Sequence, residues 1–311
     1  MWHKLFRGVG ASENLIPQGI KSEFISNLSK QSAFFKIFER FFNSNCAAFT
    51  HAEDSAHARV SVNKRQVAFT LAEVLITLGV IGIVAAMTLP TLIQHRQEKI
   101  TVNQLKKSYS ILQQVYDRIV FETGSEPKDR CMSGMYEENS HIIMANKFAP
   151  YLNIAQNCIG KDSAYTQKHC TDSGTANSGV STSVRLIDGT TMNFRLWNGQ
   201  SNWVWGTSKP LGAVCGRINV DVNGPKSPNK SGFDQFAFYL TNYGIVPVGT
   251  QAESEHAFEK FCNQAVAPWG TDLGGNFSNG YGCTAWVLFN ENQDYLHCSD
   301  LGWNKKSRCK K

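Results

Sequence analysis

The chain has 311 residues, a net charge of +6 and 18% charged residues, a length that allows one or two domains. Most of the excess positive charge lies in residues 1–68, and the rest of the chain carries the mixed charge of an ordinary soluble surface. This distribution excludes a strongly basic nucleic-acid-binding domain. The sequence also lacks a Gly-Xaa-Ser-Xaa-Gly motif and a phosphate-binding glycine loop, so we expect no enzymatic activity.

Residues 1–59 form an extension that contains the aromatic and basic stretch SAFFKIFERFF. Two interpretations are open for this segment. It is either a long leader or poorly ordered extension, or translation begins near Val60 or Val62 and leaves a short basic leader at residues 60–68. We assign it no chemistry under either interpretation.

Residues 69–93 form an apolar run in which Glu73 is the only ionisable side chain. At about 1.5 Å per residue, a helix of this length crosses a hydrocarbon core of about 30 Å. Lys64 and Arg65 directly before the run favour an amino-terminus in the cytoplasm. We expect Pro90 to kink or interrupt the helix, because proline has no backbone N–H.

Glu73 is costly within an apolar segment. A cut between Ala68 and Phe69 would create a new α-amino group one helical turn before this acid. The amine could then pair with Glu73 of the same chain or of a neighbour. The simpler alternative is that Glu73 lies near the helix start, close to lipid headgroups, where the helix dipole favours an acid.

Residues 68–73, Ala-Phe-Thr-Leu-Ala-Glu, with the apolar helix after them, resemble the class III signal of type IV prepilins and type II secretion pseudopilins. In that family a membrane-embedded peptidase cuts before the Phe and methylates the new amine. The resemblance therefore implies cleavage between Ala68 and Phe69, N-methylation of Phe69, and roles in assembly for Glu73 and Pro90. Ala68 stands where the family more often has Gly.

The resemblance also implies a function and a location. It predicts a minor pilin or pseudopilin, inserted once in the inner membrane with its head in the periplasm, and later part of a filament or the cell surface. Its partners would be the prepilin peptidase, other pilin or pseudopilin subunits and the inner-membrane assembly platform. The alternative is an ordinary signal peptide cut after Ala86, which would release a secreted binding protein or adhesin that begins at Met87.

Helical periodicity continues over residues 94–124. Leu105, Leu112 and Ile119 repeat at heptad spacing, and Gly124 ends the pattern. We expect this amphipathic continuation of the helix to pack its apolar stripe on a head domain.

The sequence pattern over residues 129–311 predicts an α+β head domain. The Asp188-Gly189 pair between two alternating segments indicates a β-hairpin. Further strands are predicted in GRINVDVNG, DQFAFYLTNYGIVPVG and TAWVLFN, and helices in EENSHIIMANKFAPYL and ESEHAFEKFCNQ. With the family resemblance, this order implies a pilin-like fold, in which a long N-terminal helix packs on an antiparallel sheet.

Cysteines are concentrated in the head. Cys46 stands alone upstream, and no pair among the other eight has the two-residue spacing of common zinc or redox sites. Disulfides in an oxidising compartment are therefore favoured over metal ligation. Their connectivity cannot be read from sequence. The candidates are Cys131, Cys158, Cys170, Cys215, Cys262, Cys283, Cys298 and Cys309.

The loop VDVNGPKSPNKSGFDQF is the candidate site of the head. Asp221, Asn223, Asn229 and Asp234 offer hard oxygen ligands of the kind that calcium prefers. The loop resembles one found in many pseudopilin-like heads, although its spacing is not that of an EF-hand. The alternative, which we favour, is that these side chains bond to nearby backbone amides.

Two further patterns have a functional and a structural interpretation. Six tryptophans in the head are either an exposed sugar-binding surface or part of the core; they are Trp197, Trp203, Trp205, Trp269, Trp286 and Trp303. The tail WNKKSRCKK is basic, with Lys305, Lys306, Arg308, Lys310 and Lys311. We expect this short tail to be solvated rather than to bind nucleic acid.

Overall fold

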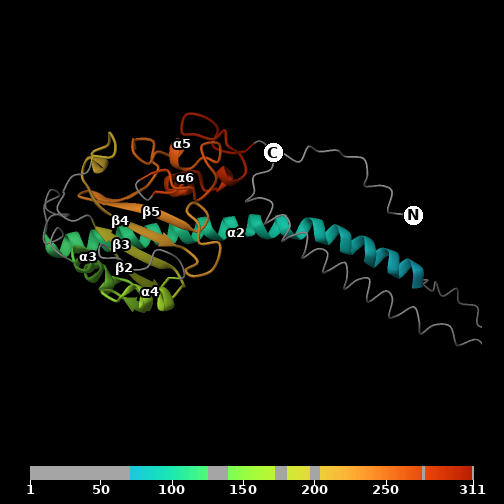
Figure 1. Ribbon diagram of the computed structural model, residues 1–311, viewed down its shortest axis with the longest axis horizontal. Helices are drawn as coiled ribbons and strands as arrows, with labels where there is room; N and C mark the ends of the chain where they lie inside the picture. Colours follow the sequence, from blue (N-terminus) through green and yellow to red (C-terminus); the bar gives the residue numbers. More distant parts are fainter. Residues whose placement is uncertain (1–70, 125–138, 172–180, 197–203, 275–276, 310–311) are drawn as a thin grey trace, which may run out of the picture. The chain divides into compact units, whose positions relative to one another are not determined.

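The computed structural model describes residues 71–124, 139–171, 181–196, 204–274 and 277–309. These residues form a long helix, an antiparallel sheet and several short helices (Figure 1). The α+β class with a helix on a sheet is thus present. The predicted cleavage site, Cys131, Trp197, Trp203 and the last two lysines lie outside the described residues.

Helix α2 runs from Leu71 to Thr123 without interruption. The expected interruption at Pro90 is therefore wrong, because a proline removes only one bond from the ladder while its fixed φ is compatible with a helix. The threonine hydroxyls on either side add local bonds, from Thr88 to the carbonyl of Val84 (3.0 Å) and from Thr91 to that of Thr88 (2.9 Å). Gly124 ends the helix at a φ of +62°, the left-handed conformation of a helix C-cap.

The sheet is a meander in which each strand pairs antiparallel with the next along the chain. As predicted, the Asp188-Gly189 pair connects two strands of a hairpin, with Gly189 at a φ of +92°. The predicted strands near residues 214–247 are also confirmed. The strands are β1 (Ile154–Cys158), β2 (Ser181–Leu186), β3 (Thr191–Leu196), β4 (Val214–Asp221), β5 (Gln235–Thr241) and β6 (Gly244–Pro247).

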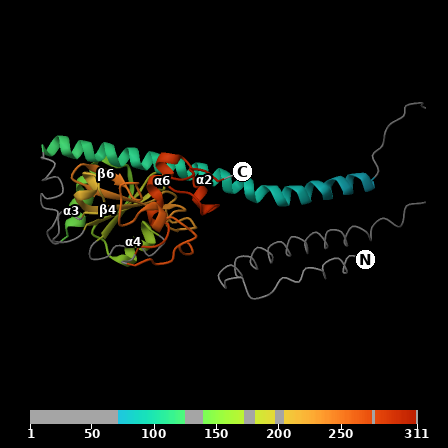
Figure 2. The ribbon, with the colours of Figure 1, turned by 90° about the horizontal axis from the view of Figure 1, so that it is seen from above.

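The second half of α2 covers one face of this sheet together with α3 (Ser140–Phe148) (Figures 1 and 2). The ring of Tyr109 on α2 stacks on Phe238 of β5 at a centroid distance of 5.6 Å. Leu105 and Leu112 are fully buried in the same core, and Ile119 is partly buried against it. The heptad stripe thus has the packing role predicted from its spacing.

The other helices are short. Helix α5 (Phe258–Phe261) and α3 fall in segments predicted to be helical, whereas α4 (Ser163–His169) and strand β1 have no counterpart in the prediction. Single 3₁₀ turns are η3 (Ala149–Tyr151), η4 (Pro210–Gly212), η5 (Tyr281–Cys283) and η6 (Asp294–Leu296).

The segment TAWVLFN is helix α6 (Thr284–Asn290), so the predicted strand is wrong. Its first four residues are all buried, because the helix contacts both α2 and β5. A short helix that is apolar on every side shows no 3.6-residue period, and such a run cannot be distinguished from a buried strand by pattern alone.

The tryptophans that the structure describes belong mainly to the core. Trp286 is fully buried and stacks on Phe258 at 4.1 Å, and Trp205 is 7% exposed. Trp269 and Trp303 are partly buried against the main core. These four side chains therefore do not form an exposed sugar-binding platform.

The packing of α2 gives a test by truncation. We expect Leu112→Ala to lower the free energy of unfolding by about 3 kcal/mol, because it removes fully buried methyl groups and leaves a cavity. Thermal and chemical unfolding of the full chain in detergent measures the loss. The matched control Leu92→Ala truncates the same side chain on the same helix where it is 69% exposed. Equal losses in the two variants would contradict the packing role of Leu112.

Candidate functional sites

The first half of α2 is an uncovered apolar surface. Of the described residues, only those of α2 form a helix long and apolar enough to cross a membrane, and no residue of its most apolar stretch is buried. Leu71 and Met87 are 70% and 73% exposed. Burying such a surface in a bilayer or among other helices is strongly favourable.

Two predicted assembly residues lie on this surface. Glu73 is the acid in the first turn of α2, and Pro90 lies inside the helix. At Gly79 and Gly82, no described atom outside the adjacent residues and the helix's own backbone lies within 4 Å of the position that a Cβ would take. Small residues of this kind allow the backbones of neighbouring helices to approach closely in a membrane. Ala68 and Phe69, the predicted cleavage site, are not among the described residues.

Polar contacts hold the second half of α2 against the head. The side-chain amide of Gln113 donates to the carbonyl of Ile245 (3.0 Å) and accepts from its N–H (3.3 Å), so one side chain satisfies both backbone groups of a residue in the edge strand β6. Tyr116 donates to the carbonyl of Thr241 at 3.1 Å. These bonds would fix the register of α2 on the sheet. Each of them forms only when a particular turn of the helix lies opposite a particular residue of the head.

Ion pairs extend the same attachment along α2. Lys106 pairs with Glu291 (2.5 Å) and Lys107 with Asp188 (2.7 Å), from two different loops of the head. Glu98 lies 2.7 Å from the imidazole of His297. Exposed pairs of this type contribute little free energy individually. Their distribution over three turns of the helix nevertheless restricts its orientation.

The calcium candidates come together on the loop between β4 and β5. Asp234 accepts from the backbone N–H groups of Asn229 (2.9 Å) and Lys230 (2.8 Å), and from the side-chain amide of Asn223 (3.1 Å). Asp221 accepts from the N–H of Asn223 at 3.3 Å and from the side chain of Gln235 at 3.1 Å. Both carboxylates therefore serve to close the loop.

Asn229 lies at the centre of the loop's acceptors. With its amide nitrogen turned inward, it donates to the carbonyls of Gly224 (3.0 Å) and Lys226 (3.1 Å) and to Asp221 Oδ2 (3.1 Å). An amide nitrogen in that place satisfies oxygens that would otherwise be available to a cation. The side-chain Oδ1 of Asn223 is the buried atom of this loop without a hydrogen bond. The geometry favours the loop-closing interpretation over the calcium site.

Burial dominates the electrostatics of this loop. It raises the pKa of the Asp221 carboxyl to about 7, and the nearby Asp234 adds to the increase. Burial also raises the pKa of Asp234, against the lowering effect of its backbone hydrogen bonds. In the folded loop Asp221 is therefore mostly protonated below about pH 7.

Disulfides cross-link the head. Cys158 bonds to Cys170, Cys262 to Cys283, and Cys298 to Cys309, with sequence separations of 12, 21 and 11 residues. Cys215 is also disulfide-bonded. Among the described residues, no group of three or more histidines, cysteines or acids is placed to hold a metal ion. The predicted disulfides are therefore present, and the metal-ligation alternative has no support there.

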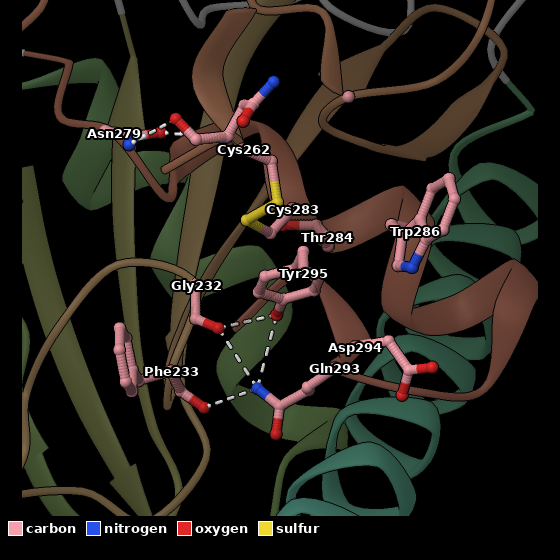
Figure 3. The surroundings of a disulfide bond; sticks show 12 residues. Gly232, Phe233, Cys262, Asn279, Cys283, Thr284, Trp286, Gln293, Asp294 and Tyr295 are labelled. Carbon is pink, nitrogen blue, oxygen red and sulfur yellow. Dashed lines mark hydrogen bonds between the residues drawn. A yellow bond between two sulfur atoms is a disulfide. The ribbon is translucent and has the colours of Figure 1, made fainter. Parts of the chain in front are cut away.

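The Cys262–Cys283 bridge fastens α5 to η5 beside a buried polar contact (Figure 3). Tyr295 donates to the carbonyl of Gly232 at 2.6 Å, and Gln293 donates to the carbonyls of Gly232 (3.1 Å) and Phe233 (2.9 Å). Gly232 has a φ of +81°, and an added Cβ there would lie 3.0 Å from Cys283 Sγ. The C-terminal segment is thus bound to the loop that contains the calcium candidates.

A second buried polar cluster was not anticipated from the sequence. Tyr239 donates to Glu253, and its hydroxyl lies 2.8 Å from His256 Nδ1. Glu253 also accepts from the N–H of Gly249 at 2.6 Å. All three side chains are buried, which gives them a structural role in joining β5 to the following loop. No short-range motif links these positions, so only the tertiary structure brings them together.

No family model matches the chain, and comparison with curated proteins and with solved structures found no significant match.

The raised pKa of Asp221 predicts a dependence of stability on pH. The folded-state pKa of about 7 lies above the unfolded value, so the folded state holds more protons between about pH 4 and 7. The free energy of unfolding should then fall as pH rises through this range, by at most about 1.4 kcal/mol per pH unit for one group. Asp221→Asn should flatten this slope and raise stability at pH 8.

Urea unfolding in the presence of a chelator at pH 4.5 and pH 8 measures the slope. Asp117→Asn removes the same charge from the exposed face of α2 and is the control. If the free energy of unfolding of Asp221→Asn falls with pH as steeply as that of the wild type, the Asp221 carboxyl does not cause the pH dependence.

Proposed function

We propose that this protein is a subunit of a type IV pilus or type II secretion filament, processed by a prepilin peptidase and assembled through α2. The observation that carries the proposal is the division of one continuous helix into two halves. Residues 71–93 are apolar and exposed, whereas the stripe from Leu105 onward is buried in the head. A filament subunit needs both halves, one to pack among other helices and one to carry a head.

The sequence before the helix supports the same function. Residues 68–73 resemble the prepilin signal, and Lys64 and Arg65 favour retention of the leader in the cytoplasm. The apolar first half of α2 is compatible with a membrane anchor. The disulfides fit a head that resides in an oxidising compartment such as the periplasm.

The competing function is a secreted binding protein released by cleavage after Ala86. That residue lies inside α2, with intact helix on both sides. Cleavage there would leave the segment from Met87 to Ile93 as an exposed apolar end of a soluble protein. The continuous helix therefore favours cleavage upstream of Phe69.

A matched pair of variants distinguishes the two cleavage sites. Ala68→Leu and Ala86→Leu each enlarge the small residue before one proposed cut. We expect only Ala68→Leu to accumulate the uncut precursor, and mass analysis of the wild type to find N-methyl-Phe69 at the amino-terminus. A wild-type protein that begins at Met87, or a precursor that accumulates only in Ala86→Leu, would exclude the filament function.

The role of Glu73 gives a second prediction. Glu73→Gln keeps the size of the side chain but removes the charge that would pair with the new amine of Phe69. We expect normal membrane insertion and cleavage, and a several-fold lower amount of the protein in sheared filaments, since a charge pair in an apolar environment fixes position more than it adds stability.

The control is Thr77→Ala, one turn further along the same exposed surface, where the lost hydroxyl donates to the carbonyl of Val74 within the helix. Immunoblots of the membrane and filament fractions compare the variants. Equal recovery of Glu73→Gln and wild type in filaments would remove the charge-pairing role.

A further inference from the structure

The sheet has a polar face opposite α2. Along β3 and β4, apolar side chains such as Phe194 and Ile218 point into the main core. Because successive strand residues point to opposite faces, Arg195 and Arg217 lie on the other face. The register pairs these two arginines directly across the strands. Like charges in this position destabilise a sheet unless something compensates them.

Arg217 is buried without an acidic partner among the described residues. It is 8% exposed, and its Nη1 makes one long hydrogen bond of 3.5 Å to the hydroxyl of Tyr281. Its guanidinium lies 5.0 Å from the ring centroid of Phe277 and 5.5 Å from that of Tyr281. Within the described part of the head, its Nε has no hydrogen-bond partner. A buried guanidinium with open donors costs free energy until an anion pairs with it.

Arg195 adds a second cation at the same place. Its Nε is also buried and has no hydrogen-bond partner in the part of the chain that the structure describes, although the residue as a whole is only half-buried. Burial, and next the charge of Arg217, lower the pKa of the Arg195 guanidinium. An anion bound beside Arg217 would relieve this repulsion as well as the open hydrogen bonds.

A cavity of about 140 Å³ opens beside Arg217 on this face. Its polar lining includes Asn193, Asn219, Gln235, Ser231, Ser278 and Tyr281. Several of these residues are half-buried, so the cavity reaches solvent. The amides and hydroxyls suit a ligand with several hydroxyl groups, since each can donate or accept.

The end of the cavity away from Arg217 limits the charge of the ligand. Asp221 lines that end, four residues along β4 and therefore about 13 Å away. Its carboxyl already accepts from Gln235 at 3.1 Å. Above its pKa of about 7 this carboxyl is charged and would repel a second negative group on the ligand, whereas a ligand hydroxyl could donate to it. The lining therefore favours one anionic group and a neutral, hydroxylated remainder.

We propose that this cavity binds a small hydroxylated carboxylate of the sugar-acid class, with its carboxylate on the guanidinium of Arg217. The fork of an arginine matches the two oxygens of a carboxylate. The site lies on the opposite face of the sheet from α2, and the proposal is independent of the filament function.

The full chain in detergent, titrated with galacturonate, tests this site by saturation-transfer NMR and thermal shift. Galactose has the same ring without the carboxylate, and we expect it to bind at least tenfold more weakly. A titration with inorganic phosphate distinguishes a site that is specific for sugar acids from a site that binds any oxyanion. Equal binding of galactose and galacturonate, or binding of phosphate without galacturonate, would overturn the proposal.

Arg217→Met keeps much of the side-chain volume and should weaken galacturonate binding at least tenfold, without lowering the melting temperature of the free protein. The control Arg185→Met removes a half-buried arginine of β2 that does not line the cavity. Galacturonate binding equal to that of the wild type in Arg217→Met would exclude the site.

A second variant covers the case in which Arg217→Met does not fold. Asn219→Asp places a carboxylate two residues from Arg217 on the same strand face. This internal anion should raise the melting temperature and reduce galacturonate affinity at least tenfold. Unchanged affinity in Asn219→Asp would equally contradict the proposal.

Discussion

The packing of the second half of α2 on the apolar face of the sheet is the constraint on which the rest of the structure depends. Leu105 and Leu112 provide the buried contact, and Gln113 ties the helix to the edge strand β6. Because a helix is stiff over a few turns, this attachment also fixes the direction in which the exposed first half begins. The apolar surface of residues 71–93 is therefore joined to the head by continuous helix and not by a flexible linker.

The same attachment explains why the polar face of the sheet remains available. Helices α2 and α3 together cover one of the two faces of the sheet. The other face is partly covered by a smaller core around Trp205, Tyr239 and Tyr281. Where that core ends, side chains such as Asn193 and Arg217 line a cavity instead of packing against apolar groups. Burying polar side chains of a central strand costs free energy unless they find hydrogen-bond partners, and a bound ligand would supply such partners.

Much of the architecture could be predicted from local sequence. The Asp188-Gly189 turn specified its hairpin because few residue pairs adopt a tight turn so readily, and the heptad stripe specified the buried side of α2. Helix α6 was mistaken for a strand because its first four residues are all buried. The continuity of α2 through Pro90 was also missed, since the cost of a proline depends on what surrounds it.

The candidate sites were predictable to different degrees. The loop acids were found because they lie close together in the sequence, but their hydrogen-bond partners, such as Asn229, could be assigned only from the geometry. The pairing of Arg195 with Arg217 depends on the register of β3 and β4, which are joined by a long connection. A connection of that length places no limit on register, unlike a two-residue turn. The pairing of these two arginines could therefore not be predicted from local sequence.

The two functional proposals each depend on a charge that another molecule would pair with, an acid on α2 and a cation on the sheet. In the proposed filament, a charge pair between Glu73 and the new amine of Phe69 would favour a single arrangement of neighbouring helices. On the polar face, Arg217 is buried and its Nε makes no hydrogen bond to a described residue. The protein is therefore less stable without the ligand than with it. In both proposals another molecule, a neighbouring subunit or an anion, would supply the opposite charge.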